Sequence, residues 1–523
     1  MVASVFLAAL LGCSHPDVAD LVIRAAVVHV GNGVTHSPGF IVIGKGKILA
    51  VGGESLALPP GVAVTDLGDA VVTPGFIEGA THLTLNRGSR ENEEGRESTA
   101  SYRASYAVDP RSQEAAGRLR EGVTSVVVHP GAANVIGGLS CWVKLGGPEA
   151  TARVERDALG LRVTLGSEPS AGHGGRGLMN RRPQSRMSNI FELRYQFERV
   201  RQDALARSAG GGQEPSADDA VLLAALRNEI PVFWKASTAK DVWAAVRLSE
   251  EFGLKRSVVI ESQEADLAAK ELVAANIPAL VGVLSDPRYR VATGRRRGGV
   301  DDSIDLSARA ERALDHVFGS GAAGELEGSA GALDEHHEDE HDEHAALELI
   351  GHEGHGHAPG QHPCPIGCTE NHLHIICDNP LHRHDETDPT CYGHNCCATG
   401  VALPKEEHDP IAGGTGLWNK GVEFGFGSAG RSGGTTLLDH ARIAVHRGMP
   451  RERAISTLTL APARILGISD RVGSLEPGKD ADLLFFEGDP LLPTSTLIGI
   501  MVDGRRVYGQ EIGAHFADKE PVK

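Results

Sequence analysis

Residues 230–262 read IPVFWKASTAKDVWAAVRLSEEFGLKRSVVIES and contain two short apolar runs on either side of a mixed polar and apolar stretch. The two runs are rich in β-branched and aromatic residues, which is typical of buried strands. Between them, Val242, Ala245, Val246 and Leu248 recur at helical spacing. A strand, a helix and a second strand in this order predict two parallel strands joined by a crossover helix.

The same alternation continues on both sides of this stretch. Residues 122–131, GVTSVVVHPG, and 161–166, LRVTLG, are further short apolar runs, so residues 75 to about 467 predict an α/β domain with a parallel sheet, closed or open. The two ends of the chain differ, because residues 19–73 and 478–510 consist of short β-branched runs broken by Gly and Pro. These runs predict strands, and we expect both ends to complete one small β domain.

Composition excludes several classes of protein. The chain has 523 residues, and 51 Lys and Arg against 69 Asp and Glu give a formal net charge of −18. A nucleic-acid binder needs a basic face, so we expect no nucleic-acid partner. No apolar run approaches the roughly 20 residues that cross a bilayer as a helix. The composition therefore favours a globular protein whose partners are small molecules or metal ions, and it does not predict an oligomeric state.

Three stretches carry a resemblance to a known family. Residues 71–83 read VVTPGFIEGATHL, residues 120–138 read REGVTSVVVHPGAANVIGG, and residues 460–490 read LAPARILGISDRVGSLEPGKDADLLFFEGDP. In this order they resemble the first barrel strand, the imidazolonepropionase-like branch and the ending of the amidohydrolase superfamily. The resemblance implies an α/β fold, a TIM-like (β/α)8 barrel with a small β-sandwich built from both termini. It also implies metal-dependent hydrolysis of non-peptide carbon–nitrogen bonds.

The resemblance gives the expected domain boundaries. We expect a signal peptide and lipobox region over residues 1–18, a composite β-sandwich over 19–74 and 468–510, and the barrel over 75–467. A His/Cys-rich insertion over 326–400 interrupts the barrel, and residues 511–523 form a C-terminal tail. Because 277–284 reads as the seventh barrel strand and 422–428 as the eighth, the insertion follows strand seven on the face that carries active sites in such barrels. We expect it to cap the barrel mouth.

The family's metal ligands match few positions of this chain. The first His of the family's His-x-His falls on Ala80, and only the second is kept, as His82. Lys235 and Ser237 stand where the related branch carries His, and Ala429 stands where the family's catalytic Asp is expected. With four of the five usual positions vacant, the resemblance predicts weak or lost metal-dependent activity and a doubtful barrel metal. We assign no catalytic residue.

Four side chains are candidates for a ligand pocket in the barrel: His82, His129, Lys144 and Lys235. His82 is either a metal ligand or a hydrogen-bonded remnant. Lys235 is either functional, as a carbamylated lysine or a Schiff base, or paired with a carboxylate such as Glu261. His129 and Lys144 flank the loop 134–138, and we expect them at the barrel mouth.

The insertion has the composition of a metal-handling segment. It holds 13 of the 24 His and six of the 8 Cys, and residues 334–344 read DEHHEDEHDEH. Imidazole, carboxylate and thiolate are ligands for zinc or another divalent metal, whereas a solvated linker is the alternative for the acidic tract. The six cysteines form either zinc sites or, in an exported protein, three disulfides. The candidate ligands are Cys364, Cys368, His372, His374, Cys377, Cys391, His394, Cys396 and Cys397.

Three functional hypotheses follow from these observations. The chain is a hydrolase of non-peptide carbon–nitrogen bonds, of the cyclic amide type, with weak or lost metal-dependent activity. Alternatively, it is an exported metal-binding protein that buffers zinc through the insertion, or a non-catalytic barrel that binds a small-molecule ligand.

The N-terminal residues predict export and a lipid anchor. An apolar run of about ten residues leads into Leu10-Leu11-Gly12-Cys13, which resembles a bacterial lipobox. We therefore expect the protein in the cell envelope, held to the membrane through lipidated Cys13; a cytoplasmic protein with an apolar N-terminus is the alternative. Metabolic labelling with a fatty-acid analogue should label the wild type and leave Cys13→Ser unlabelled. A wild type that stays unlabelled would remove the lipoprotein hypothesis.

Overall fold

The computed structural model describes residues 19–85, 92–93, 96–147, 151–171, 183–211, 214–281, 413–427 and 436–509. Cys13, Ala429 and all the candidate ligands from Cys364 to Cys397 lie outside these residues. Among the helices within the described ranges, none is long and apolar enough to cross a membrane.

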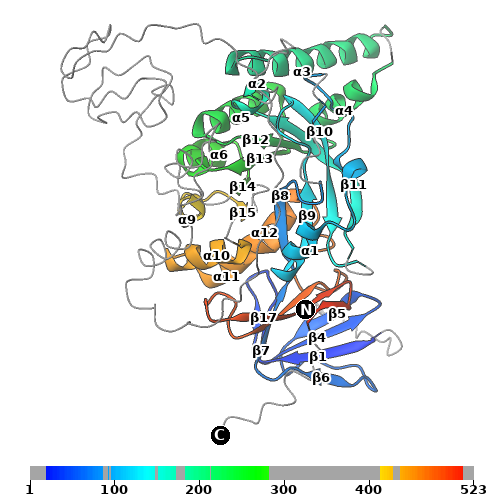
Figure 1. Cartoon of the computed structure of the whole chain (residues 1–523), viewed down its shortest axis with the longest axis vertical. Coiled ribbons are helices and arrows are strands. Elements are labelled where there is room, and N and C mark those ends of the chain that lie inside the picture. Colours follow the sequence, from blue (N-terminus) through cyan, green and yellow to red (C-terminus); the bar gives the residue numbers. More distant parts are fainter. Residues whose placement is uncertain are drawn as a thin grey trace, which may run out of the picture. The chain divides into compact units, whose positions relative to one another are not determined.

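Eight strands form one curved sheet in the order β15-β14-β13-β12-β11-β10-β9-β8 (Figure 1). The sheet is nearly closed, because its two edge strands approach each other: a Cβ built on Gly427 would lie 3.7 Å from the backbone nitrogen of Ala80. The strands are β8 (Phe76–Thr81), β9 (Val123–Val128), β10 (Ile136–Lys144), β11 (Arg153–Thr164), β12 (Val232–Lys235), β13 (Ser257–Ser262), β14 (Ala279–Val281) and β15 (Phe424–Phe426).

The expectation of an all-parallel sheet was wrong at one strand. β10 pairs antiparallel with both β9 and β11, whereas the other five pairings of the sheet are parallel. The reason is the length of the connections. Only residues 129–135 separate β9 from β10, and only residues 145–152 separate β10 from β11. A parallel pair needs a crossover of about a dozen residues or more, so these short links force β10 to run backwards.

Helix α5 (Ala239–Phe252) confirms the helix expected between the two parallel strands, and it packs on β13. Thr238 and Asp241 form a capping box at its start, and Gly253 ends it in the left-handed conformation at φ 66°. The capping box satisfies backbone N–H groups at the start of the helix, and the left-handed Gly253 helps to satisfy C=O groups at its end. The expected apolar positions of this helix, Val242 among them, are buried.

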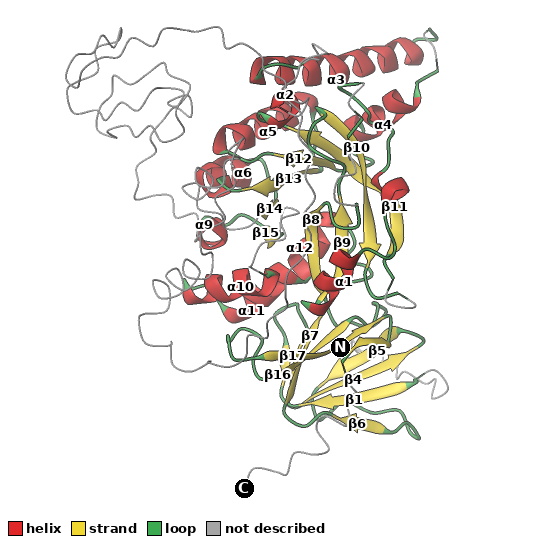
Figure 2. Ribbon diagram, viewed as in Figure 1, coloured by secondary structure: helices red, strands yellow, loops and turns green. Residues whose placement is uncertain are grey.

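The other helices follow or flank the barrel strands, as Figure 2 shows. They are η1 (Ala104–Ala107), α1 (Gln113–Arg120), α2 (Glu168–Ala171), α3 (Arg186–Ser208), α4 (Ala217–Leu226), η3 (Ala265–Ala268), α6 (Ala269–Ala274), α9 (Gly413–Asn419), α10 (Leu437–His446), α11 (Arg451–Leu458) and α12 (Leu460–Leu466).

Strands from both ends of the chain form two further sheets. One has the order β5-β4-β1-β6 and the other the order β18-β17-β16-β7-β2-β3, in which β16 pairs antiparallel with β7. The two sheets share one core, to which Ile23 and Ile41 contribute from the first and Val72 and Phe485 from the second. The strands are β1 (Leu21–Ala25), β2 (Val27–His29), β3 (Thr35–His36), β4 (Gly39–Gly44), β5 (Lys47–Gly52), β6 (Val64–Asp66), β7 (Ala70–Pro74), β16 (Leu483–Glu487), β17 (Thr496–Val502) and β18 (Arg505–Tyr508).

A buried charge cluster connects β10 to the C-terminal strands. The Lys144 side chain is 1% exposed, and its Nζ lies 2.9 Å from Asp480, 3.0 Å from Asp482 and 2.5 Å from Asp503. Burial by itself lowers the pKa of Lys144, but the three carboxylates outweigh burial and raise this pKa above its ordinary value. The lysine is therefore the charged centre of this cluster.

Removing the charge of Lys144 should destabilise the protein strongly. Lys144→Met leaves the buried carboxylate of Asp482 without its cation, whereas Asp480 keeps Lys47 and Arg471, and breaking a buried pair in this way costs about 3 to 5 kcal/mol. Unfolding in urea should show this loss, and adding Asp482→Asn should recover part of it. Lys255→Met removes an exposed lysine and should stay within roughly 0.5 kcal/mol of the wild type. An equally small effect for Lys144→Met would contradict the role of the cluster.

Candidate functional site

Charged and imidazole side chains gather where the barrel strands end. His82 follows β8, His129 follows β9, and Arg162, Lys235 and Glu261 lie near the ends of β11, β12 and β13. Active sites of such barrels lie at the carboxyl ends of the parallel strands. We call these five residues the barrel centre.

Strand register places Arg162 and Lys235 on the inner face of the barrel. Arg162 pairs with Phe233 of β12, and Lys235 pairs with Ile260 of β13. Neighbouring residues in register point to the same face of a sheet. Phe233 and Ile260 belong to the apolar cluster inside the barrel, together with Leu280. The two cationic side chains therefore share a face with this apolar interior.

Arg162 and Glu261 form a buried ion pair. Arg162 is fully buried, and its Nη1 lies 2.9 Å from Oε1 of Glu261, whose side chain is 7% exposed. The distance fits an ion pair, but the angles do not fit a hydrogen bond, so the guanidinium nitrogens and Oε1 have no hydrogen-bond partner. Burial alone raises the pKa of Glu261; Arg162 and, less strongly, His82 and Lys235 outweigh it and lower this pKa to about 2. Glu261 is thus a carboxylate at neutral pH.

The backbone of Glu261 adopts an unusual conformation. Its φ is 55°, in the left-handed region that side chains other than glycine rarely adopt. Such a conformation costs on the order of 1–3 kcal/mol and persists only where the surrounding structure holds it in place. The ion pair with Arg162 is one contact that holds the side chain.

The ring of His82 is oriented by the neighbouring strand. Its Nδ1 lies 2.9 Å from the backbone oxygen of His129, so Nδ1 donates this hydrogen bond. Nε2 then faces Oε1 of Glu261 at 3.8 Å. Burial, followed by the charge of Arg162, lowers the pKa of His82 and keeps the ring neutral near pH 7. The side chain is 24% exposed, so Nε2 is the imidazole nitrogen that remains open to a ligand.

His129 uses both ring nitrogens inside the protein. Nε2 donates to the backbone oxygen of Gly79 at 3.2 Å, and Nδ1 accepts a hydrogen bond from Ser140 at 2.7 Å. The ring also packs edge-on against Phe233, with 5.2 Å between ring centres. Burial, with a smaller effect of Arg162, lowers the pKa of His129 to about 3. The structure therefore places His129 as a buried, neutral connection between strands, with neither ring nitrogen left for a ligand.

Lys235 pairs with a different carboxylate from the one expected. Its ammonium forms an ion pair with Glu168 of α2 and donates to Oγ of Ser237 at 2.7 Å. Glu168 is 38% exposed, so this pair lies toward the solvent side of the centre. Glu261, the partner named from the sequence, is instead paired with Arg162.

The remaining candidates do not join the barrel centre. Lys144 lies in the cluster with Asp480, Asp482 and Asp503. Ala80 is buried in the apolar interior of the barrel and offers only a methyl group. Sequence reasoning missed Arg162 altogether. The available signal was an arginine in the strand sequence LGLRVTLG, because arginine is almost never fully buried without a partner.

The described residues of the barrel centre do not fit a resident divalent cation. The free donors are Nε2 of His82 and the carboxylate of Glu261, and the guanidinium of Arg162 already contacts that carboxylate. Across the described residues, no group of three or more His, Cys, Asp or Glu side chains could hold a metal ion. Zinc sites in proteins have three or four protein ligands of these types.

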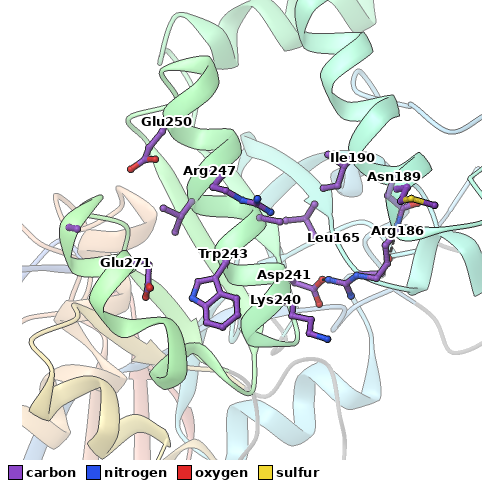
Figure 3. A pocket seen from close by; sticks show the side chains of 15 residues that line it. Leu165, Arg186, Asn189, Ile190, Lys240, Asp241, Trp243, Arg247, Glu250 and Glu271 are labelled. Atoms are coloured by element: carbon purple, nitrogen blue, oxygen red, sulfur yellow. Dashed lines mark hydrogen bonds and ion pairs between the residues drawn. The ribbon is translucent and has the colours of Figure 1, made fainter. Parts of the chain in front are cut away.

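A separate groove of about 920 Å³ lies on the outer side of the barrel (Figure 3). Helices α3, α5 and α6 line it, with Ile190, Trp243 and Glu271 among its residues. It includes none of the five residues of the barrel centre. We base the candidate site on the barrel centre, because the groove has an ion pair of Arg186 with Asp241 but no comparable gathering of unpartnered polar atoms.

Comparisons with known proteins agree with this fold. The structure resembles an amidohydrolase from Thermotoga maritima MSB8, with a TM-score of 0.62 and 21% identity over 94% of this chain and 100% of that one. A family model described as "Amidohydrolase family" matches residues 328–509. The fold is thus that of an amidohydrolase-type barrel. The chain is similar to the amidohydrolase family in the sequence of residues 328–509 and in its fold.

Sequence relatives cover short parts of the chain. An imidazolonepropionase of Fusobacterium nucleatum is 51% identical over 63 residues, 12% of this chain and 15% of that protein. A 5-methylthioadenosine/S-adenosylhomocysteine deaminase of Symbiobacterium thermophilum is 28% identical over 184 residues, 29% of this chain and 41% of that protein. This chain therefore matches less than half the length of each, and both relatives are hydrolases of carbon–nitrogen bonds.

The pKa of His129 predicts an acid-sensitive stability. Between about pH 6.5 and pH 3 the unfolded chain binds a proton at this imidazole that the folded chain does not bind. Stability due to this group is therefore complete above pH 6.5 and falls as the pH drops, by up to about 1.4 kcal/mol per pH unit. In His129→Gln, the loss between pH 6.5 and pH 5 should be smaller than in the wild type by roughly 2 kcal/mol.

Urea unfolding at both pH values measures this difference. His446→Gln changes an exposed histidine and serves as the matched control, which should lose as much stability as the wild type. Equal pH dependence in all three proteins would show that His129 is not held neutral.

Proposed function

We propose that this chain is an amidohydrolase-superfamily protein in which metal-dependent hydrolysis of non-peptide carbon–nitrogen bonds is weak or lost. The observation that carries the proposal is the ion pair between Arg162 and Glu261. A fixed cation occupies the carboxylate that would otherwise be available to a metal ion. Like charges repel strongly at such short range inside a protein.

The large contribution of a catalytic metal ion to the rate of hydrolysis supports this proposal. A catalytic metal lowers the pKa of its bound water from about 15.7 to about 7, which corresponds to roughly 12 kcal/mol of activation of the attacking water. A positioned acid or base contributes 10²- to 10⁴-fold, or about 3 to 5 kcal/mol. His82 with Nε2 open is a candidate for such a base. One side chain of this kind does not replace a metal.

A second candidate function concerns the insertion, which lies outside the described residues. Its nine candidate Cys and His ligands support binding of zinc or a similar ion, in an exported protein that buffers metal at the cell envelope. The two proposals are compatible, because they concern separate parts of the chain.

Elemental analysis of purified protein, combined with a hydrolysis assay, tests both proposals. Full-length protein loaded with zinc should retain the metal, and a variant lacking residues 334–397 should lose nearly all of it. His82→Ala should leave the metal content of both proteins unchanged. None of these proteins should hydrolyse a cyclic amide such as hydantoin above the rate in buffer.

Two results would contradict these expectations. One tightly bound ion per chain that persists in the deletion variant and disappears with His82→Ala would place a metal in the barrel. Metal-dependent turnover of the cyclic amide by the deletion variant would show that the activity is retained.

A further inference from the structure

The Arg162 guanidinium is a buried hydrogen-bond donor without an acceptor. The side chain is fully buried, and none of Nε, Nη1 and Nη2 has a hydrogen-bond partner among the described residues. Glu261 supplies opposite charge at 2.9 Å but not the hydrogen-bond geometry. A guanidinium carries five N–H donors in a planar fork, and leaving buried charged donors unsatisfied costs several kcal/mol in a typical protein. A water molecule, an ion or a ligand that enters the site can supply the missing acceptor.

A second unpartnered donor lies next to Arg162 on the same face. Thr164 follows two residues later on β11, so its side chain points to the same side of the sheet. It is fully buried, and its hydroxyl has no hydrogen-bond partner. Thr164 is also in register with Lys235 on β12. A guanidinium, a hydroxyl and an ammonium therefore follow one another across two neighbouring strands.

The buried donors of this region favour an anion as the ligand. Arg162 and Lys235 are two cations with at most 7% of their side chains exposed, and Glu261 is the carboxylate buried with them. The other carboxylate, Glu168, is 38% exposed and lies toward solvent. The two histidines of the centre add hydrogen-bonding groups rather than charge. Glu168 pairs with Lys235 and Glu261 lies beside Arg162, so the charges balance, and an anion is favoured by the unpartnered donors of Arg162 rather than by a net charge.

We propose that the barrel centre binds a small carboxylate anion, with Arg162 as its principal binding residue. The two oxygens of a carboxylate match the fork of a guanidinium, as in bidentate arginine–carboxylate pairs. The Thr164 hydroxyl donates a further hydrogen bond, and Lys235 adds electrostatic attraction. His82, which is the partly exposed member of the centre, faces the open side. The inference deepens the proposed function by giving the class of ligand that the barrel binds in place of a metal ion.

Binding of acetate to the full-length protein tests this proposal. Acetate at neutral pH should raise the melting temperature in a saturable way relative to sodium chloride at the same ionic strength, because a ligand that binds only the folded state stabilises it. Isothermal titration calorimetry gives the dissociation constant. Inorganic phosphate at matched ionic strength is the second probe, and it should bind more weakly than acetate.

Three variants assign the binding to this site. Arg162→Gln should weaken acetate binding at least tenfold, and Thr164→Val, which keeps the side-chain volume, should weaken it severalfold. Because Arg162→Gln leaves Glu261 without its cation, Arg162→Gln/Glu261→Gln provides a neutral pair that should fold and should bind equally poorly. Arg227→Gln, which removes an arginine that is 61% exposed, is the matched control and should bind as the wild type does.

The possible outcomes separate this inference from the proposed function. Absence of saturable acetate binding, or binding that survives in both Arg162 variants, overturns the inference and indicates that water satisfies the guanidinium. Tighter binding of phosphate than of acetate overturns the assignment to carboxylates. Neither result restores a metal ion to the barrel, which the metal content and the hydrolysis rate of the same samples report independently.

Discussion

The charge pair of Arg162 and Glu261 determines the chemistry of the barrel centre. Taking two charges out of water costs several kcal/mol for each ion, and their attraction offsets this cost only when they stay together. The pair therefore fixes the position of both side chains and helps to hold Glu261 in its left-handed backbone conformation. It keeps Glu261 ionised and works with burial to keep both neighbouring histidines neutral. A divalent cation at Oε1 of Glu261 would lie beside the guanidinium of Arg162.

The two histidines form a connected structure around this pair. The carbonyl of His129 orients the ring of His82, and the ring of His129 is in turn held by Ser140 and by the carbonyl of Gly79. Residues on β8, β9 and β10 are thus linked through one imidazole. In metalloenzymes such outer contacts orient the imidazoles that bind the metal. Here they leave a single open imidazole nitrogen, on His82, beside a carboxylate that is already paired.

Much of the fold was predictable from the sequence, because local patterns determine it. Residues 230–262 have strand and helix periodicities that agree with their burial in the structure. The pairing of β16 with β7 follows from the similar character of the two chain ends. Arg162 was not predictable in the same way. Its strand has the apolar composition of a buried element, and the carboxylate that stabilises the arginine lies 99 residues further along the chain.

The position of Lys144 shows how one reversed strand changes the assignment of site residues. In the sequence, Lys144 follows the loop 134–138. If β10 ran parallel to its neighbours, Lys144 would lie at its carboxyl end, near the barrel mouth. Because β10 runs antiparallel, Lys144 pairs with Ser125 near the start of β9, whereas Ile136 pairs with Val163 near the end of β11. Lys144 therefore lies at the opposite end of the barrel strands from the barrel centre, next to the carboxylates of Asp480 and Asp503.

The reversal of β10 also gives the C-terminal strands a role in positioning the centre. One end of β10 is fixed by the ion pairs of Lys144 with Asp480 and Asp482, and Ser140, four residues earlier, holds the ring of His129. The carbonyl of His129 orients His82 in turn. A contiguous set of contacts thus connects carboxylates from the last 50 residues of the chain to an imidazole that follows the first barrel strand.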